Sequence, residues 1–363
     1  YKQIAVEAIE RAIQLESGGL VLEFETLLEM TLNPNYGVRI VEVLNEVCES
    51  YFQTSGFKSE IRLTPNDLRD FDRPPRMRSG PRLEPMLELF ERGAHAGGNL
   101  LSIESTGGKE LFDDALMMCD TRAVLFSLAV LGVRDMHFLW KHIVDIAAKT
   151  GVVPGGDTAC GFGNTAMVLA ERGYIPKVFA AVVRLMTVVR TLAAVEEGAL
   201  GPDKDCGYEG PYIKAITGTP ISMEGKTAAC AHTSPVGNVA AACCDLWSNE
   251  SVQNIKLLGG MAPTVYLEQL EYDVRLFNKA IENGPESARF LQKLLVESDI
   301  HYDPQAFILS PKSVIDISAE IIKGNSDLEG AILGCMKGLD LIEAAVADGR
   351  LKIEEREKSW INR

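Results

Sequence analysis

The repeated alternation of short apolar runs with longer amphipathic segments is the feature that most constrains the fold of this chain. About eight apolar runs follow one another, and they are too apolar to have a solvent-facing side. Strands of this kind belong to parallel sheets that helices cover on both faces. The runs expected as strands are residues 19–24, 61–63, 99–104, 123–131 (or a buried helix), 151–158, 189–194, 220–223 and, most weakly, a stretch within 256–265.

The number of these units favours a closed barrel over an open sheet. The chain has 363 residues, a length that suits one (β/α)₈ barrel or two ordinary domains. Residues 267–361 read mostly as amphipathic helix. We therefore predict an α/β fold, a TIM (β/α)₈ barrel over residues 1–330, with additional C-terminal helices over residues 331–363 that pack on the barrel.

Charge and cysteine content exclude several function classes. The longest apolar stretch, residues 178–195, is interrupted by Arg184 and Arg190, which argues against a membrane span. A net charge of −15 makes the chain a poor general binder of nucleic acid or of anionic membranes. Eight cysteines are too few for a disulfide scaffold of this length, so we expect free thiols in a reducing, cytoplasmic setting.

One loop, residues 64–85, is unusually rich in proline and arginine. Two interpretations stay open: a stiff, solvated connection, or a basic docking or anion-binding loop on an otherwise acidic protein. The arginines of this loop are Arg69, Arg73, Arg76, Arg78 and Arg82.

Candidate metal ligands follow three of the expected strands. Glu104 closes the run at 99–104, while Cys160 and Cys206 stand in glycine-rich loops after later strands. In a barrel, reacting groups gather at such strand ends. Both cysteines are flanked by glycine and aspartate, so a role as small core residues explains them poorly. Two thiolates and one carboxylate would make a three-ligand zinc site with an open fourth position, and no CxxC pair indicates a zinc finger.

Other motifs compete with this set or fail. Cys230 and His232 are rival ligands, because a CxH pair at a strand end would direct both side chains to one face. The stretch 224–227 (EGKT) is no P-loop, since Pro220 stands where that motif needs glycine. The turn 105–109 (STGGK) either cradles an anion or simply connects a strand to a helix.

Four segments carry a resemblance to a known family. They are LLSIESTGGKE (100–110), GDTACGFGNTAM (156–167), GPDKDCGYEGPYIKAITGTPISMEGKTAACAH (201–232) and CCDLWSNES (243–251). They resemble the methyltransferase subunit of methanol:cobalamin methyltransferase systems, over residues 19–273 and more weakly to the C-terminus. The resemblance implies a TIM barrel with zinc at its mouth, bound by Glu104, Cys160 and Cys206. The CAH segment then takes a structural role.

The resemblance also implies the reaction and the partner. Zinc would polarise the C–O bond of methanol, and the methyl group would pass to the cob(I)alamin cofactor of a separate corrinoid protein, as in methanogenesis and one-carbon metabolism. Asp157 and Glu224 are candidates for protonating the leaving oxygen, or else hydrogen-bonding residues around the metal. We expect a homodimer or hetero-oligomer.

Two regions depart from the family pattern: GFGNT after Cys160, and residues 261–273. They leave room for another methyl donor, either a methoxylated compound or a methylamine. A non-catalytic barrel and zinc-dependent thiol alkylation are further alternatives, although the sequence contains no acceptor-thiol site that we can identify.

Overall fold

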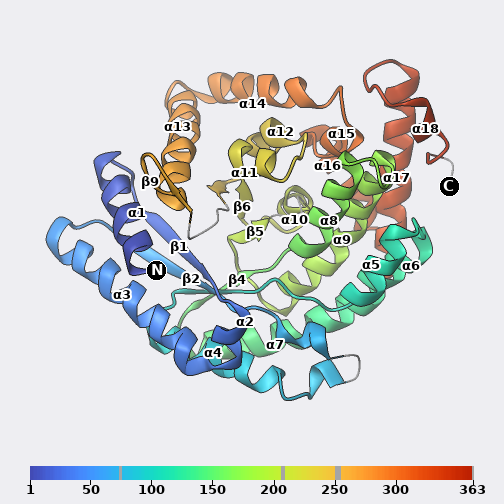
Figure 1. Cartoon of the computed structure of the whole chain (residues 1–363). Helices are drawn as coiled ribbons and strands as arrows, with labels where there is room; N and C mark the ends of the chain where they lie inside the picture. The colour runs from blue at the N-terminus through green and yellow to red at the C-terminus, as the bar shows by residue number, and fades with distance from the viewer. Residues whose placement is uncertain (73–75, 206–208, 250–254, 362–363) are drawn as a thin grey trace.

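The computed structural model describes residues 1–72, 76–205, 209–249 and 255–361 and shows a barrel of parallel strands surrounded by helices (Figure 1). The first parallel sheet has the order β1–β2–β3–β4 and the second has the order β5–β6–β7. A hydrogen bond from Leu200 N to Pro154 O, 2.9 Å long, connects β4 to the segment that leads into β5. The strands therefore run around the barrel in chain order. They are β1 (Leu20–Glu25), β2 (Ser59–Thr64), β3 (Leu100–Ser102), β4 (Val153–Gly156), β5 (Asp203–Asp205), β6 (Ile221–Glu224) and β7 (Leu246–Ser248).

Helices follow most of these strands and cover the outside of the barrel (Figure 1). Helix α1 (Lys2–Gln14) precedes β1. The helices that follow strands are α2 (Leu28–Leu32), α3 (Pro34–Ser55), α4 (Leu83–His95), α5 (Lys109–Met117), α6 (Thr121–Phe126), α7 (Val133–Thr150), α8 (Cys160–Glu171), α9 (Lys177–Glu197), α10 (Gly210–Thr217), α11 (Lys226–Ala231) and α12 (Gly237–Cys243). A π-helical turn (Ser127–Gly132) joins α6 to α7, and two 3₁₀ turns, η1 (Leu68–Phe71) and η2 (Arg76–Arg78), follow β2.

The C-terminal part is helical, as its amphipathic pattern predicts. It consists of α13 (Ala262–Glu282), α14 (Pro285–Asp299), α15 (Pro304–Ile308), α16 (Pro311–Ile321), α17 (Asp327–Ala347) and α18 (Glu355–Lys358). Helix α17 packs on α9 and α16. It also continues across residues 330 and 331, and the division of the chain at that point stays a prediction.

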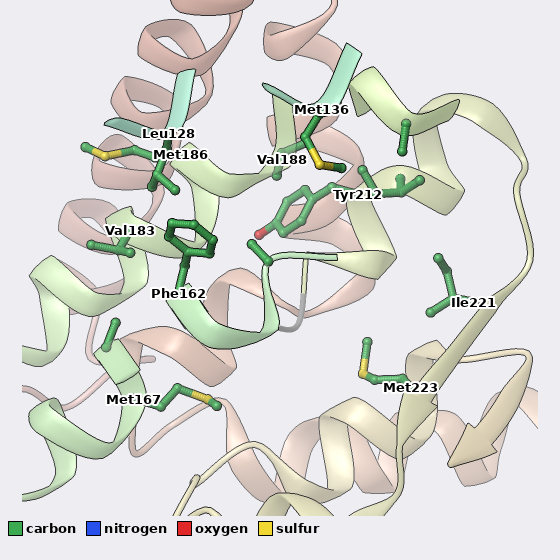
Figure 2. Close-up of a cluster of buried hydrophobic side chains, with 14 of the residues drawn as sticks. Leu128, Met136, Phe162, Met167, Val183, Met186, Val188, Tyr212, Ile221 and Met223 are labelled. Atoms are coloured by element: carbon green, nitrogen blue, oxygen red, sulfur yellow. The ribbon is translucent and has the colours of Figure 1, made fainter. Parts of the chain in front are cut away.

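Helix α9 is the most deeply buried of the long helices and explains one wrong strand prediction. Residues 189–194 were expected as a strand but form the second half of α9, whose side chains are buried almost all round. Figure 2 shows Val183 and Met186 of this helix beside Phe162 of α8. A helix that packs on every side has no polar stripe, so its sequence resembles that of a buried strand.

Two helical stretches, Thr121–Thr150 and Lys177–Glu197, are long and apolar enough to span a membrane by length and composition. In their most apolar windows, 56% and 89% of the residues are buried inside the structure. Burial of this kind is typical of helices in a globular core. Residues 123–131 belong to the first stretch, so the helical alternative for that run is correct and the strand is wrong.

The remaining corrections concern the last strands. Strands β5 and β7 were missed. Strand β5 was missed because it reads Asp203-Lys204-Asp205 and contains no apolar residue. The expected strand within 256–265 is instead a short antiparallel hairpin of β8 (Lys256–Leu257) and β9 (Gly260–Met261), followed directly by α13. That hairpin lies outside the two parallel sheets.

Candidate active site

The three predicted metal ligands follow three consecutive strands of the barrel. Glu104 lies two residues beyond β3 and forms a parallel bridge with Asn66, which lies two residues beyond β2. Cys160 is the first residue of α8, after β4. Cys206 directly follows β5 and lies outside the described residues. Because carboxyl ends of parallel barrel strands open at one mouth, Glu104 and Cys160 belong to the same face of the barrel.

Cys160 is buried and connected to β5 through a threonine. Cys160 is only 3% exposed, and its Sγ lies 3.3 Å from Thr158 Oγ1. The Thr158 hydroxyl donates to the carbonyl oxygen of Lys204 over 2.6 Å. Helix α8 begins at Cys160, a residue that the sequence analysis placed in a glycine-rich loop. The thiol therefore sits in the first turn of a helix, where partial positive charge favours an anionic ligand.

Glu104 is partly exposed and lies close to a lysine from the barrel interior. The Lys204 ammonium is 3.6 Å from Glu104 Oε1 and 3.5 Å from Glu23 Oε2, and it also pairs with Glu25. Burial raises the pKa of Glu25 to about 7; Lys204 opposes this rise, while Glu23 and Glu104 add to it. One lysine thus balances three carboxylates at this end of the barrel.

Asp157, which directly follows β4, is buried beside the Glu104 segment. Its Oδ2 accepts hydrogen bonds from Ser105 Oγ at 2.5 Å and from Ser105 N at 3.3 Å. Burial raises the pKa of Asp157 to about 8, Arg190 and Ser105 oppose the rise, and Glu104 adds to it. The carboxyl therefore holds a proton at neutral pH. Its Oδ1 is buried and accepts no hydrogen bond from the part of the chain that the structure describes.

Glu224 is the last residue of β6 and is fully buried. His232 Nε2 lies 3.4 Å from Glu224 Oε1, so the histidine of the CAH segment pairs with this carboxylate. Cys230 is exposed and lies on helix α11, not at a strand end. The expectation that Cys230 and His232 share one face is therefore wrong, because neighbours two apart diverge on a helix.

Comparison with known proteins assigns the chain to a family. The family model for the methanol-cobalamin methyltransferase B subunit, MtaB, matches residues 1–363. The chain belongs to the MtaB family. A methanol–corrinoid protein co-methyltransferase from Methanosarcina barkeri (strain Fusaro / DSM 804) is 37% identical over 365 residues, which cover 98% of this chain and 77% of that protein.

The fold comparison agrees with this assignment. A crystal structure of the methanol:cobalamin methyltransferase complex MtaBC from Methanosarcina barkeri superposes with a TM-score of 0.94 at 36% identity. The match covers 100% of this chain and 79% of that one. The predicted TIM barrel with added helices, the predicted family and the predicted methyltransferase class are confirmed.

The metal site of this MtaB-family chain stays a prediction. Among the described residues, no group of three or more His, Cys, Asp or Glu is placed to hold a metal ion. Cys206, one of the three expected ligands, lies outside the described residues. The cysteines within the described ranges are all free thiols.

Sequence reasoning missed several polar residues of this site: Thr158, Lys204, Ser105 and Arg190. A signal for two of them exists in the sequence. Thr158 precedes Cys160 by two residues and Lys204 precedes Cys206 by two, and in extended chain such neighbours point to one side. Arg190 carries no such signal, because it comes from the middle of a core helix.

The arginine-rich loop after β2 divides into a buried and an exposed part. Arg69 is fully buried and pairs with Asp67 and Asp135, so it is not a docking residue. Arg76 and Arg78 are exposed, whereas Arg73 lies outside the described residues. The interpretation of the whole loop as solvated is therefore wrong for Arg69.

Proposed function

We propose that this MtaB-family chain transfers the methyl group of methanol to the cobalt of a corrinoid bound to a separate protein, with a zinc ion held by Glu104, Cys160 and Cys206. The observation that carries the proposal is the position of these residues after β3, β4 and β5, three strands in succession around one barrel mouth. The names of the similar proteins, a methanol–corrinoid protein co-methyltransferase and the MtaBC complex, support the substrate and the partner.

The donor set fits a catalytic zinc ion. Two thiolates and one carboxylate are ligands that zinc prefers, and three protein ligands leave a position for a substrate oxygen. When bound, zinc would act as a Lewis acid that polarises the C–O bond of methanol. Cys160 supports this fit, because its buried thiol lies at the first turn of α8.

Asp157 is our preferred proton donor for the leaving oxygen. Its raised pKa keeps it protonated at neutral pH, and both Ser105 bonds go to Oδ2, which leaves Oδ1 as the atom that carries the proton. A donor with a pKa near the working pH is suited to general acid catalysis. Glu224, whose Oε1 faces His232, is the second candidate.

The surroundings of the site favour a small methyl donor. Phe162, an aromatic residue close in sequence to Cys160, is buried in the core and packs edge to face on Phe112 with 5.0 Å between ring centroids. It therefore does not offer a flat surface to an aryl ether. Glycine, aspartate and threonine dominate the rest of the GDTACG stretch, residues 156–161.

The same proposal includes the assembly and the setting. The corrinoid cofactor would approach from the mouth of the barrel, so the chain would act in a hetero-oligomer with the corrinoid protein; a homodimer of this chain is the alternative. Free thiols and a reduced cobalt both require reducing conditions, which supports a cytoplasmic location.

The test is a methylation assay with the reduced corrinoid protein and a panel of methyl donors at equal concentration: methanol, a methoxylated aromatic compound and methylamine. The absorbance of the corrinoid reports conversion of cob(I)alamin to methylcobalamin. We expect turnover with methanol that is lost in Cys160→Ser and Cys206→Ser and retained in Cys230→Ser. Efficient turnover of the aromatic ether without turnover of methanol would overturn the substrate assignment.

A further inference from the structure

The turn 105–109 and the buried arginine of the loop after β2 meet in one cluster of charged side chains. We infer that Asp67, Arg69 and Asp135, here called the loop clamp, are positioning residues for the proposed metal ligand Glu104. The inference rests on the proposed function only in taking Glu104 as a ligand. The clamp itself is a feature of the described residues.

The clamp is a buried, two-sided ion pair. Arg69 Nε and Nη2 donate to Asp67 Oδ1 and Oδ2 at 2.9 and 2.8 Å, and Arg69 Nη1 and Nη2 donate to Asp135 Oδ1 and Oδ2 at 3.0 and 2.8 Å. The side chains of these residues are 0%, 0% and 2% exposed for Arg69, Asp67 and Asp135. Two edges of the planar guanidinium group are thus occupied by carboxylates, which fixes the orientation of the Arg69 side chain.

Asp67 connects the ion pair to the segment that carries Glu104. Its Oδ2 accepts the backbone N–H of Thr106 at 2.8 Å and the Thr106 hydroxyl at 3.1 Å. On the other side, Asn66 forms the parallel bridge with Glu104 itself. Asn66 and Asp67, which follow β2, therefore contact the two ends of the segment 104–106.

Asp135 holds the same turn from the side of α7. A Cβ atom on Gly107 would overlap the Asp135 side chain, so the turn packs directly against the clamp. Gly107, the first of the two glycines of STGGK, is thereby explained by its close approach to a buried ion pair and needs no bound anion to account for it. Ser105, between Glu104 and Thr106, is held independently by Asp157 and Arg190.

The consequence concerns metal affinity and geometry. Glu104 is partly exposed, with a side chain 40% accessible, and its Oε1 lies 3.6 Å from the Lys204 ammonium. Bonds to the backbone on both sides of it restrict where its carboxylate can reach. Loss of groups that orient a metal ligand typically weakens metal binding about 10- to 100-fold.

The experiment uses the full chain, loaded with Co²⁺ as a spectroscopic substitute for zinc. Asp67→Asn removes the charge that holds Arg69 and places an amide NH₂ among hydrogen-bond donors of Arg69 and Thr106. We expect a Co²⁺ affinity about 10-fold or more below that of the parent chain, measured by chelator competition, and a changed d–d absorption band. Asp135→Asn, which keeps Asp67 in place, should give a smaller change in the same direction and serves if Asp67→Asn does not fold.

The matched control is Asp303→Asn. Asp303 is also a buried carboxylate that accepts a backbone N–H, from Gln305 at 2.8 Å, and pairs with a cation, Lys177, at 2.9 Å. The Asp303→Asn variant should have a lower melting temperature than the parent chain but the same Co²⁺ affinity and the same d–d absorption band. A purely structural clamp would behave like this control.

Glu104→Gln separates the two possible failures. If Glu104→Gln binds Co²⁺ with the affinity and spectrum of the parent chain, Glu104 is no ligand, and both the proposed site and the clamp's role toward it are rejected. If Glu104→Gln loses the metal but the folded Asp67→Asn and Asp135→Asn chains bind it unchanged, the proposed site stands and the clamp inference is overturned.

Discussion

Arg190 donates a hydrogen bond from Nη2 to the backbone carbonyl oxygen of Ser105 over 2.7 Å. This bond connects the middle of the buried helix α9 to the residue directly after Glu104. The same guanidinium lies over the Phe162 ring, with 4.6 Å from Cζ to the ring centroid. A core helix thus contributes directly to the order of the candidate site.

The first prediction concerns Asp157 and the pH dependence of stability in the metal-free protein. Its folded pKa, about 8, lies above the usual value of 3.8, so the folded chain binds this proton more tightly than the unfolded chain. The free energy of unfolding therefore falls as pH rises from about 4 to about 8, by at most about 1.4 kcal/mol per pH unit from this group.

Asp157→Asn should remove that contribution and flatten the curve in this window. Urea unfolding at several pH values checks this, with Asp145→Asn at an exposed site on α7 as the control. An unchanged slope in Asp157→Asn would show that the buried carboxyl is already ionised at neutral pH.

The second prediction concerns the metal. Cys160→Ser and Cys206→Ser should each lose zinc while keeping the circular dichroism spectrum of the parent chain, because a hydroxyl is a poor replacement for a thiolate ligand. Metal analysis after dialysis gives the stoichiometry. Cys230→Ser, at an exposed position on α11, should keep the zinc. Zinc loss from Cys230→Ser alone would place the ligands in the CAH segment.

The third prediction concerns Lys204, which is 9% exposed and lies among Glu23, Glu25 and Glu104. Lys204→Met leaves these carboxylates without their shared cation. We expect a loss of about 1–3 kcal/mol in the free energy of unfolding, between the values for exposed and buried pairs. The loss should be greater above pH 7, because Glu25, with a raised pKa of about 7, is ionised there.

Lys214→Met is the control for Lys204→Met, because Lys214 pairs with Asp245 at the surface. It should cost less than about 1 kcal/mol. Equal losses in the two variants, measured by chemical unfolding, would contradict a special role for the lysine inside the barrel.

The fourth prediction compares two glycines with left-handed backbone. Gly108 has a φ of 89° and a Cβ there would overlap the carbonyl oxygen of Ser127, whereas Gly218 has a φ of 78° and open space around it. Gly218→Ala should cost about 1–2 kcal/mol from backbone strain alone. Gly108→Ala should cost about 1–3 kcal/mol more, from overpacking. Urea unfolding measures the loss of stability in both variants. Equal losses would mean that the backbone of the turn after β3 shifts to accommodate the added methyl group.

The fifth prediction concerns association with the corrinoid protein. We propose that the exposed arginines Arg76 and Arg78, together with Arg73, guide the partner to the barrel mouth. Reversing these charges to glutamate should slow association several-fold at low ionic strength and weaken its salt dependence. Arg39→Glu on α3, an exposed arginine on another helix, is the control. Association kinetics identical to the parent chain would show that the loop only connects β2 to α4.

Much of the fold follows from the sequence pattern. The runs at 19–24, 61–63, 99–104, 151–158 and 220–223 overlap the strands β1, β2, β3, β4 and β6, respectively. These strands could be recognised because their runs include apolar residues that the core buries, among them Phe24, Leu63 and Leu101. Glu104 and Cys160 stood out as polar or reactive residues at the ends of such runs. In the structure Glu104 lies two residues beyond β3, and Cys160 begins the helix that follows β4.

Strand β5 and helix α9 show where pattern recognition fails. Strand β5 is polar because its buried residues have charged neighbours: Lys204 pairs with Glu25, and Arg62 lies near Asp203. Helix α9 is apolar all round because other elements cover it on every side. In both cases the environment reverses the usual composition of the element.

The sequence by itself therefore determined the strands β1 to β4 and β6, the family, and the placement of Glu104 and Cys160 after barrel strands, because these depend on local pattern and motif. Only the tertiary structure decided how the buried charges pair. Arg69 meets Asp135 across 66 residues of chain, and Ser105 meets Arg190 across 85. Ion pairs and hydrogen bonds depend on distance in space, and no spacing along the chain encodes which buried groups the packed barrel brings within 3 Å of one another.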